Sequence, residues 1–207
     1  MSRTFVVATG NPHKVEELSE LMPGVPLQPL SDFPSAPEPV EDAPDFAGNA
    51  IIKAKSALAH TGLPSLADDS GICVDCLDGA PGIYSARYVE GSDADRRHAL
   101  HKAVGDAEDR GAQFVCVIAI AGLPDDLPLP EGVERRDGCY IATGVVHGEI
   151  VRGAERGAHG FGYDPIFELP ERGLTTAELS TEEKHAVSHR GRAVRVIAPL
   201  LNAWVGQ

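Results

Sequence analysis

Two adjacent aspartates, Asp68 and Asp69, precede Ser70 and Gly71 at the start of an apolar run. Neighbouring carboxylates repel one another unless a cation or a proton lies between them. Mg²⁺ prefers a few carboxylates plus water and phosphate oxygens, and a second carboxylate can orient or deprotonate an attacking water. A helix cap would explain one aspartate only, and the strand predicted at residues 71–77 needs no cap. The pair therefore indicates metal-dependent hydrolysis of a phosphate compound.

Cations that would offset these acids occur near the N-terminus, where a predicted strand at residues 4–8 gives way to a helix. Asn11 is a good helix N-cap, and the next residue is a proline, which suits the first helical position. Backbone amides at such a helix start can hold a phosphate group, although strand–glycine–helix turns are also common without function. The candidate phosphate-binding residues are Thr9, Gly10, Asn11, Pro12, His13 and Lys14.

A second source of cations is the alanine-rich helix predicted at residues 45–60. Asn49 and Lys53 are four residues apart and therefore share one face of this helix. Either this face contributes to the site or it is an ordinary solvated face. Glu41, in the proline-rich loop before the helix, is either a further metal ligand or a solvated loop acid.

Two later segments carry groups that suit a nucleobase. The stretch GFGYDPIF at residues 160–167 places aromatic rings beside glycines, as base stacking requires, although Tyr163 and Phe167 suit a core equally well. A cation-rich stretch near residue 190 offers donors that favour a purine with a 6-oxo group over one with a 6-amino group. The candidate residues are Phe161, Gly162, Tyr163, Asp164, Lys184, His189 and Arg190.

Composition limits the class of protein. The 207 residues carry a net charge of −13, which argues against binding to a nucleic acid polymer, because such binding depends on Lys and Arg. No run approaches the roughly 20 apolar residues of a membrane-spanning helix, and the N-terminus lacks a signal-peptide pattern. We therefore expect a cytoplasmic protein that does not bind membranes.

Four cysteines stand at positions 73, 76, 116 and 139. The first two form a C-x-x-C, which is typical of a redox motif or half of a zinc site. No second C-x-x-C or neighbouring Cys/His pair completes four zinc ligands. The favoured interpretation is four reduced, structural thiols.

The remaining pattern predicts a single α/β domain. A surface helix is expected at residues 93–104, and paired strands at 113–121 and 139–146 with a surface loop between them. A tight turn is expected at His147-Gly148. Ser180 and Glu183 form a capping box, and an amphipathic helix follows from Ala193.

Five blocks of this sequence, taken together, resemble the inosine triphosphate pyrophosphatase family. They are ATGNPHKVEEL, NAIIKA, ADDSGICVDCLDGAPGIYSARY, GFGYDPIF and EEKHAVSHRGRA, and they span residues 8–193 in the family's order. The resemblance implies Mg²⁺-dependent hydrolysis of ITP, dITP and XTP to the monophosphate and pyrophosphate. It also implies a homodimer, in which the region around Ile83, Tyr84 and Tyr88 could be an interface. The implied fold is an elongated mixed β-sheet flanked by helices, with two lobes and the active-site cleft between them.

The resemblance also assigns roles to residues. Asp69 would be the catalytic residue and a metal ligand, and Asp68 and Glu41 would support the metal. Residues 9–14, Lys53 and Ser70 would contact the substrate, and residues 161–164, Lys184, His189 and Arg190 would hold the nucleotide, mainly its base. The chain departs from the family at Glu41-Asp42-Ala43, where Glu-Thr-Gly is usual, and at Gly48, where an acid is common. Asp42 or Asp45 is therefore an alternative to Glu41.

Two other functions stay open at this level. One is a related pyrophosphatase that acts on modified pyrimidines or on ordinary deoxynucleotides. The other is a nucleotide-binding module without turnover. The sequence leaves open whether water attacks the α- or the β-phosphorus.

Overall fold

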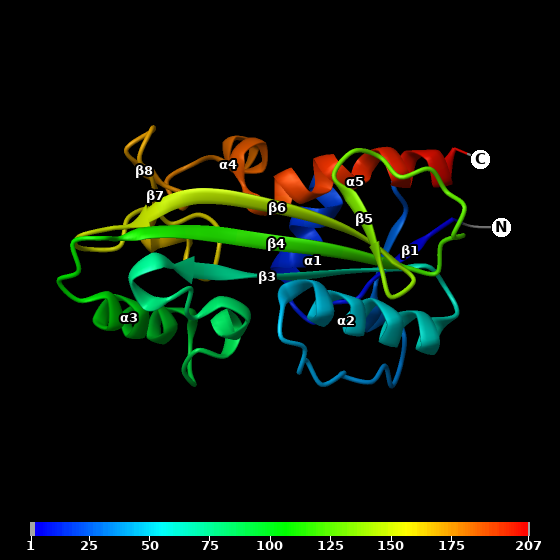
Figure 1. Ribbon diagram of the computed structural model, residues 1–207, viewed down its shortest axis with the longest axis horizontal. Coiled ribbons are helices and arrows are strands. Elements are labelled where there is room, and N and C mark those ends of the chain that lie inside the picture. Colours follow the sequence, from blue (N-terminus) through cyan, green and yellow to red (C-terminus); the bar gives the residue numbers. More distant parts are fainter. Residues whose placement is uncertain (1–2, 207) are drawn as a thin grey trace. The chain divides into compact units, whose positions relative to one another are not determined.

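The computed structural model describes residues 3–206, which form an α/β fold with a mixed sheet (Figure 1). The helices are α1 (Pro12–Leu21), α2 (Phe46–Thr61), α3 (Asp93–Val104), α4 (Thr181–Val187) and α5 (His189–Val205). The strands are β1 (Phe5–Val7), β2 (Leu27–Pro29), β3 (Ser65–Val74), β4 (Gly111–Ala121), β5 (Val133–Arg136), β6 (Cys139–Ile150), β7 (Phe167–Leu169) and β8 (Leu174–Thr175). The expected α/β class and mixed sheet are confirmed.

The sheet has the strand order β2-β1-β3-β4-β6-β7-β8, and β5 pairs with β6. β1 lies parallel to β2 and to β3, since α1 and α2 connect these strands. The β5–β6, β6–β7 and β7–β8 pairs are antiparallel. The parallel strands bring the carboxyl end of β1 and the middle of β3 next to the start of α1.

The chain divides into two compact units. The first unit contains residues 3–69, 116–144 and 192–206, and the second contains residues 70–115 and 145–191. The boundary in β3 falls between Asp69 and Ser70, so these two neighbouring candidate residues belong to different units.

The core of the first unit packs β1, β3 and β4 against α1 and α5. Phe5, Leu18, Leu66 and Ile118 are all fully buried in it. α5 contributes a continuous apolar face, which confirms the predicted amphipathic C-terminal helix. That face consists of Ala193, Val194, Ile197, Leu200 and Leu201. Each large side chain buried in this way contributes about 1.5–3 kcal/mol.

The second unit has its own core, in which α3 covers the sheet with Leu100 and Val104. The rings of Phe114 and Phe167 lie 4.3 Å apart, centroid to centroid. α3 begins at a capping box in which the side chains of Ser92 and Asp95 each accept from the other's backbone amide. The predicted helix at 93–104 is confirmed to the residue.

Several local predictions were wrong. β3 begins at Ser65 rather than at residue 71, so the aspartate pair lies within the strand and not before it. β6 continues through His147 and Gly148 to Ile150, where a tight turn was expected. A side chain at Gly148 would meet the ring of Phe167 at 2.6 Å, so this glycine allows β7 to approach closely and does not form a turn.

The loop predicted at residues 124–136 ends in a strand. β5 forms a hairpin with β6 through Asp137 and Gly138, both in the left-handed conformation that two-residue hairpin turns require. The strand predicted through Leu77 ends at Val74, and residues 75–77 form a 3₁₀ turn. Over residues 3–206, no helix has both the length and the apolar character to cross a membrane.

Candidate active site

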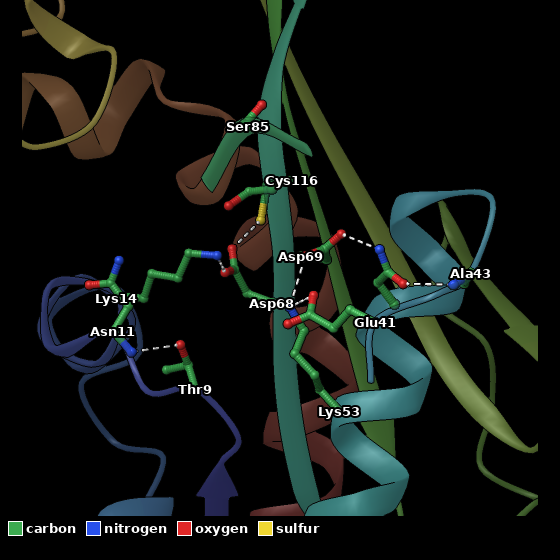
Figure 2. A network of polar contacts seen from close by, with 12 residues as sticks. Thr9, Asn11, Lys14, Glu41, Ala43, Lys53, Asp68, Asp69, Ser85 and Cys116 are labelled. Atoms are coloured by element: carbon green, nitrogen blue, oxygen red, sulfur yellow. Dashed lines mark hydrogen bonds and ion pairs between the residues drawn. The ribbon is translucent and has the colours of Figure 1, made fainter. Parts of the chain in front are cut away.

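The aspartate pair lies in the buried middle of β3, with 1% and 7% of Asp68 and Asp69 exposed to solvent. Successive residues of a strand point to opposite faces of the sheet. Asp68 is accordingly directed towards Lys14 of α1, and Asp69 towards Lys53 of α2 (Figure 2). Strand geometry therefore separates the two carboxylates and gives each its own lysine.

Asp68 is held by two groups of the first unit. Its Oδ1 forms an ion pair with Lys14 Nζ, and its Oδ2 accepts a hydrogen bond from Cys116 Sγ at 3.1 Å. Cys116 lies on β4, the strand next to β3, and is fully buried. The predicted structural role of this thiol thus includes a contact with a site carboxylate.

Asp69 belongs to a charged cluster with Lys53 and Glu41 (Figure 2). Lys53 Nζ lies 2.8 Å from Asp69 Oδ1 and 3.0 Å from Glu41 Oε2. Burial raises the pKa of Asp69, and the nearby ammonium groups of Lys53 and Lys14 only partly oppose it. Burial acts to lower the pKa of Lys53, but Asp69, Asp68 and Glu41 outweigh it and raise that pKa, so the ammonium stays charged.

Asn49 joins this cluster to the loop that carries Glu41. Its Nδ2 donates to Asp69 Oδ2 at 3.5 Å, and its Oδ1 accepts from the Ala43 amide at 3.1 Å. Asn49 is fully buried, so the face that it shares with Lys53 is not a solvated one. Asn49 was recognised on the right helix face, but its bond to the loop was not predicted.

The two departures from the resembled family lie against each other. A Cβ on Gly48 would collide with the Cβ of Ala43 and lie 3.1 Å from Asp45 Oδ1. A side chain at position 43 therefore requires glycine at position 48. Asp45 is the N-cap of α2 and pairs with Arg136, so its carboxylate is engaged away from Asp69. Of the alternatives, Glu41 is the acid that the structure brings to the cluster.

The start of α1 has the geometry predicted from the sequence. Asn11 is the N-cap, and its Oδ1 accepts from the His13 amide at 3.0 Å. Thr9 Oγ1 accepts from the Asn11 amide at 3.1 Å, which fixes the turn that leaves β1. The positive end of α1 and Lys14 thus lie on the Asp68 side of β3 (Figure 2).

In the second unit, the buried carboxylate of Asp164 organises the segment at residues 160–164. Its Oδ2 accepts from the Phe161 amide at 2.8 Å and from Lys184 Nζ at 2.7 Å. Its Oδ1 accepts from Thr176 Oγ1 at 2.8 Å. The Phe161 ring lies 5.1 Å from Lys184 Nζ, within cation–π range.

Arg190 and His189 begin α5 and belong to the same unit. Arg190 is 1% exposed, its Nη2 donates to Ser70 Oγ at 3.1 Å, and its guanidinium lies 5.8 Å from the Phe161 ring. The His189 ring stacks on Phe114 at 4.8 Å. The structure therefore brings Ser70, Phe161, Lys184 and Arg190 together.

Two residues of the segment predicted to bind the nucleotide, Tyr163 and Gly162, are held by contacts within the protein. Tyr163 is 6% exposed, its hydroxyl donates to the Ser85 carbonyl at 2.9 Å, and burial raises its pKa. Gly162 is held by α3 through Asp93 and Arg97. The contributions of Cys116, Thr176 and α3 were not predicted, because single polar residues in apolar or charged stretches give no sequence signal.

The donor set suits Mg²⁺. Hard carboxylate oxygens are the ligands that Mg²⁺ prefers, and it is usually held by one or two protein carboxylates completed by substrate phosphates. Glu41 and Asp69 already converge on one cation, the Lys53 ammonium. Within the described chain no three His, Cys, Asp or Glu side chains gather as a complete metal site. All four cysteines are free thiols.

Comparison with known proteins gives the same result as the resemblance. The chain is 50% identical over 199 residues to a dITP/XTP pyrophosphatase of Thioalkalivibrio sulfidiphilus, covering 93% of this chain and 95% of that protein. It is 46% identical over 197 residues to one of Pseudomonas aeruginosa, covering 93% and 94%.

Solved structures agree over the full length. A HAM1 protein from Coxiella burnetii has a TM-score of 0.83 and 39% identity, covering 98% of this chain and 100% of that one. The Staphylococcus aureus Ham1 protein has a TM-score of 0.81 and 36% identity, covering 97% and 98%. The model of the Ham1 family matches residues 5–200, and the chain therefore belongs to the Ham1 family.

Proposed function

We propose that this protein is a pyrophosphatase that hydrolyses dITP, XTP and ITP to the nucleoside monophosphate and pyrophosphate. The observation that carries the proposal is the cluster of Asp69 on β3, Lys53 on α2 and Glu41 in the loop before α2, beside Asp68 and Lys14. Relatives at 46–50% identity over nearly their whole length bear the name dITP/XTP pyrophosphatase. Carboxylates with matched lysines suit a triphosphate and an attacking water together.

The first unit would bind the triphosphate. Its anionic oxygens would meet the amides at the start of α1 and the ammonium groups of Lys14 and Lys53. Both lysine side chains are more than four-fifths buried, so their charges are poorly screened by solvent. Phosphate oxygens would then neutralise part of the positive charge of these lysines, which Asp68 and Asp69 neutralise before substrate binds.

Asp69 would act as the general base, orienting the attacking water and accepting its proton. Burial raises its pKa, which makes the carboxylate a better proton acceptor than an exposed aspartate. Asn49 and Lys53 hold the two oxygens of this carboxylate and so fix its direction. Glu41 and Asp69, with Asp68 in support, would hold Mg²⁺, which when bound neutralises triphosphate charge and polarises a phosphoryl oxygen.

The second unit would bind the base. Phe161 would stack on the purine, and the Lys184 and Arg190 side chains supply donors for a 6-oxo group. Asp164 would act on Phe161 and Lys184 rather than on the nucleotide, because its oxygens already accept from three protein donors. The triphosphate would thus contact residues of the first unit, and the base residues of the second.

The family resemblance also supports a homodimer in the cytoplasm, without a nucleic acid or membrane partner. Tyr84 is 57% exposed, which suits a place in such an interface. Light scattering during size-exclusion chromatography measures the mass directly. A mass near 22 kDa across micromolar concentrations, rather than twice that value, would reject the dimer.

The test of the function is pyrophosphate release from dITP, XTP, ITP, ATP, GTP and a pyrimidine triphosphate, with Mg²⁺ and with excess EDTA. Release from the first three that depends on Mg²⁺ and greatly exceeds release from the others is expected. Equal rates on all substrates would retain the hydrolytic site and reject selection of the base. Calorimetric binding of ITP without any release would indicate the nucleotide-binding module instead.

A further inference from the structure

Two side chains of helix α3 hydrogen-bond to Gly162 in the segment at residues 160–164, one at its amide and one at its carbonyl. Gly162 N donates to Asp93 Oδ2 at 2.8 Å, and Arg97 Nη1 donates to the Gly162 carbonyl at 2.9 Å. Asp93 and Arg97 are four residues apart and therefore share one face of α3. These contacts join parts of the chain that are 69 and 65 residues apart in sequence.

The two contacts together determine the backbone of Gly162. The amide belongs to the peptide before its Cα and the carbonyl to the peptide after it, so fixing both planes fixes φ and ψ. Gly162 has a φ of +60°, a left-handed conformation that glycine adopts without strain. The direction in which the chain leaves Phe161 therefore depends on α3.

Both side chains of α3 are themselves held in place. Arg97 is 14% exposed, and its Nε lies 2.9 Å from Glu155 Oε1. Asp93 Oδ1 pairs with Arg96 Nη2 at 2.7 Å, and the capping box at Ser92 secures the first turn of the helix. Burial acts to raise the pKa of Asp93, but the hydrogen bonds from Arg96 and Gly162 lower it overall, so the charged acceptor is favoured.

Phe161 is thus held from two directions. Asp164 accepts a hydrogen bond from the Phe161 amide, and α3 bonds to the amide and the carbonyl of Gly162. A stacking ring must hold one orientation before the base arrives, because ordering it on binding would reduce affinity. The α3 contacts therefore add a constraint on the backbone beside Phe161 to those of Asp164 and of the Lys184 and Arg190 cations over the ring.

We propose that Asp93 and Arg97, the α3 clamp, are positioning residues that set the orientation of Phe161 and thereby the affinity for the purine base. The inference rests on the proposed function, since it takes Phe161 as the surface on which the base stacks. The contacts of the clamp described above are all with residues of the second unit. Its loss should therefore weaken base recognition and leave phosphate recognition unchanged.

The first test is a kinetic comparison of Arg97→Ala and Asp93→Ala with the unmodified protein. The KM for dITP should rise about tenfold, the scale of one lost charge-assisted hydrogen bond, with a smaller change in kcat. The inhibition constant of inorganic tripolyphosphate, which has no base, should stay within about twofold. The proposal would be overturned if the KM for dITP and the inhibition constant of tripolyphosphate changed equally, or if the KM were unchanged in folded variants.

Conservative variants and a control keep the test decisive if either alanine variant folds poorly. Arg97→Lys retains a donor for the Gly162 carbonyl, and Asp93→Asn retains an acceptor for its amide, so both should recover part of the lost affinity. Lys102→Ala, at an exposed position of the same helix, should behave like the unmodified protein. No recovery in folded conservative variants would count against positioning by these contacts.

A second readout does not depend on turnover. Hydrogen exchange measured on the peptide covering residues 158–166 should be faster in Arg97→Ala and Asp93→Ala than in the unmodified protein. Unchanged exchange would reject the clamp even if the enzyme is active. An unmodified protein that does not hydrolyse dITP would reject the proposed function, whereas the exchange result would still decide whether the clamp exists.

Discussion

Asp68 and Asp69 are neighbours in the chain but belong to different ion pairs. Lys14 balances the first and Lys53 the second, from helices on either side of β3 (Figure 2). The sequence suggested that a cation or a proton must lie between the two carboxylates, whereas the alternation of the strand already separates them. Each acid is thus paired with its own lysine before any substrate or metal binds.

Lys53 provides a direct test of this arrangement. In Lys53→Met, Asp69 and Glu41 would face each other without the ammonium that lies within 3.0 Å of both. We expect the KM for dITP to rise at least about tenfold, because truncating one partner of a buried charge pair leaves the other unbalanced. Steady-state kinetics with saturating Mg²⁺ measures this KM.

Lys55→Met is the matched control, since Lys55 is exposed on the same helix two residues further on. It should leave the KM unchanged. A KM for Lys53→Met that equals the control value would contradict a role for Lys53 in binding phosphate.

Sequence reasoning at the residue scale identified the acids and lysines of the site but not all of their partners. Asp69 and Lys53 are 16 residues apart, and only the packing of α2 on β3 brings them together. Cys116 lies in an apolar strand pattern, so nothing in the sequence relates it to Asp68. Tyr163 was open between a core and a substrate role; the structure buries it, and its contact with substrate stays a prediction.

At the scale of elements, caps determine where the site helices begin. Asp45 is the N-cap of α2, its Oδ1 accepting from the Gly48 amide at 2.7 Å, and it also pairs with Arg136 at 2.8 Å. The hydrogen bond from Gly48 and then Arg136 hold its pKa below the ordinary value. The first turn of α2 in turn carries Asn49 towards Asp69.

Asp45→Ala should therefore lower stability by about 1 kcal/mol, the usual cost of a lost cap, or about 2–4 °C in Tm. Asp45→Ser should recover most of the loss, because serine is also a good cap. Asp42→Ala, at the exposed position three residues earlier, is the control. Calorimetric melting that finds Asp45→Ala as stable as this control would contradict the capping role.

The first turn of α3 has a predicted pH dependence. The pKa of Asp93 is lowered in the folded protein, so its ionised form stabilises the fold at a pH above the ordinary aspartate pKa of about 4. That contribution should be lost as the pH falls through the lowered pKa. Urea unfolding should show Asp93→Asn to be less stable than the unmodified protein at pH 7, with the difference shrinking towards pH 3. A difference that is constant with pH would contradict the shift.

Helices were predictable where capping residues and apolar spacing agreed. Asn11 and Asp45 mark the starts of α1 and α2 as expected, and α3 and the capping box at Ser180 were also found. Strand limits were less predictable. β3 includes polar residues because its partners bury them, and β6 passes through Gly148 because β7 approaches there. The Asp137-Gly138 pair was the available hairpin signal for β5.

At the scale of the whole molecule, the burial of the four cysteine thiols reflects the packing of both units. Cys116 and Cys139 are buried, Cys73 is partly buried and Cys76 is exposed. Burial raises the pKa of Cys73, with Asp75 adding to it, and burial also raises the pKa of Cys139. Since the thiolate is the reactive form, these thiols should react slowly at neutral pH.

Alkylation followed by intact-mass spectrometry should accordingly find one fast-reacting thiol in the native protein, at Cys76. All four should react without reductant once the chain is unfolded, as expected for free thiols. Rapid labelling of Cys116 in the native state would contradict its burial on β4 beside Asp68. Only two reactive thiols after unfolding would reveal a disulfide.

The central claim is that Asp69 activates the water that hydrolyses the triphosphate, and one measurement tests it most directly. Pyrophosphate release from dITP should be compared for the unmodified protein, Asp69→Asn and the exposed control Asp126→Asn, with circular dichroism to verify folding. Asp69→Asn should lower kcat by about 10²–10⁴-fold, as expected for a lost general base, while the kcat of Asp126→Asn should stay unchanged. A folded Asp69→Asn variant that releases pyrophosphate at a near-normal rate would contradict it.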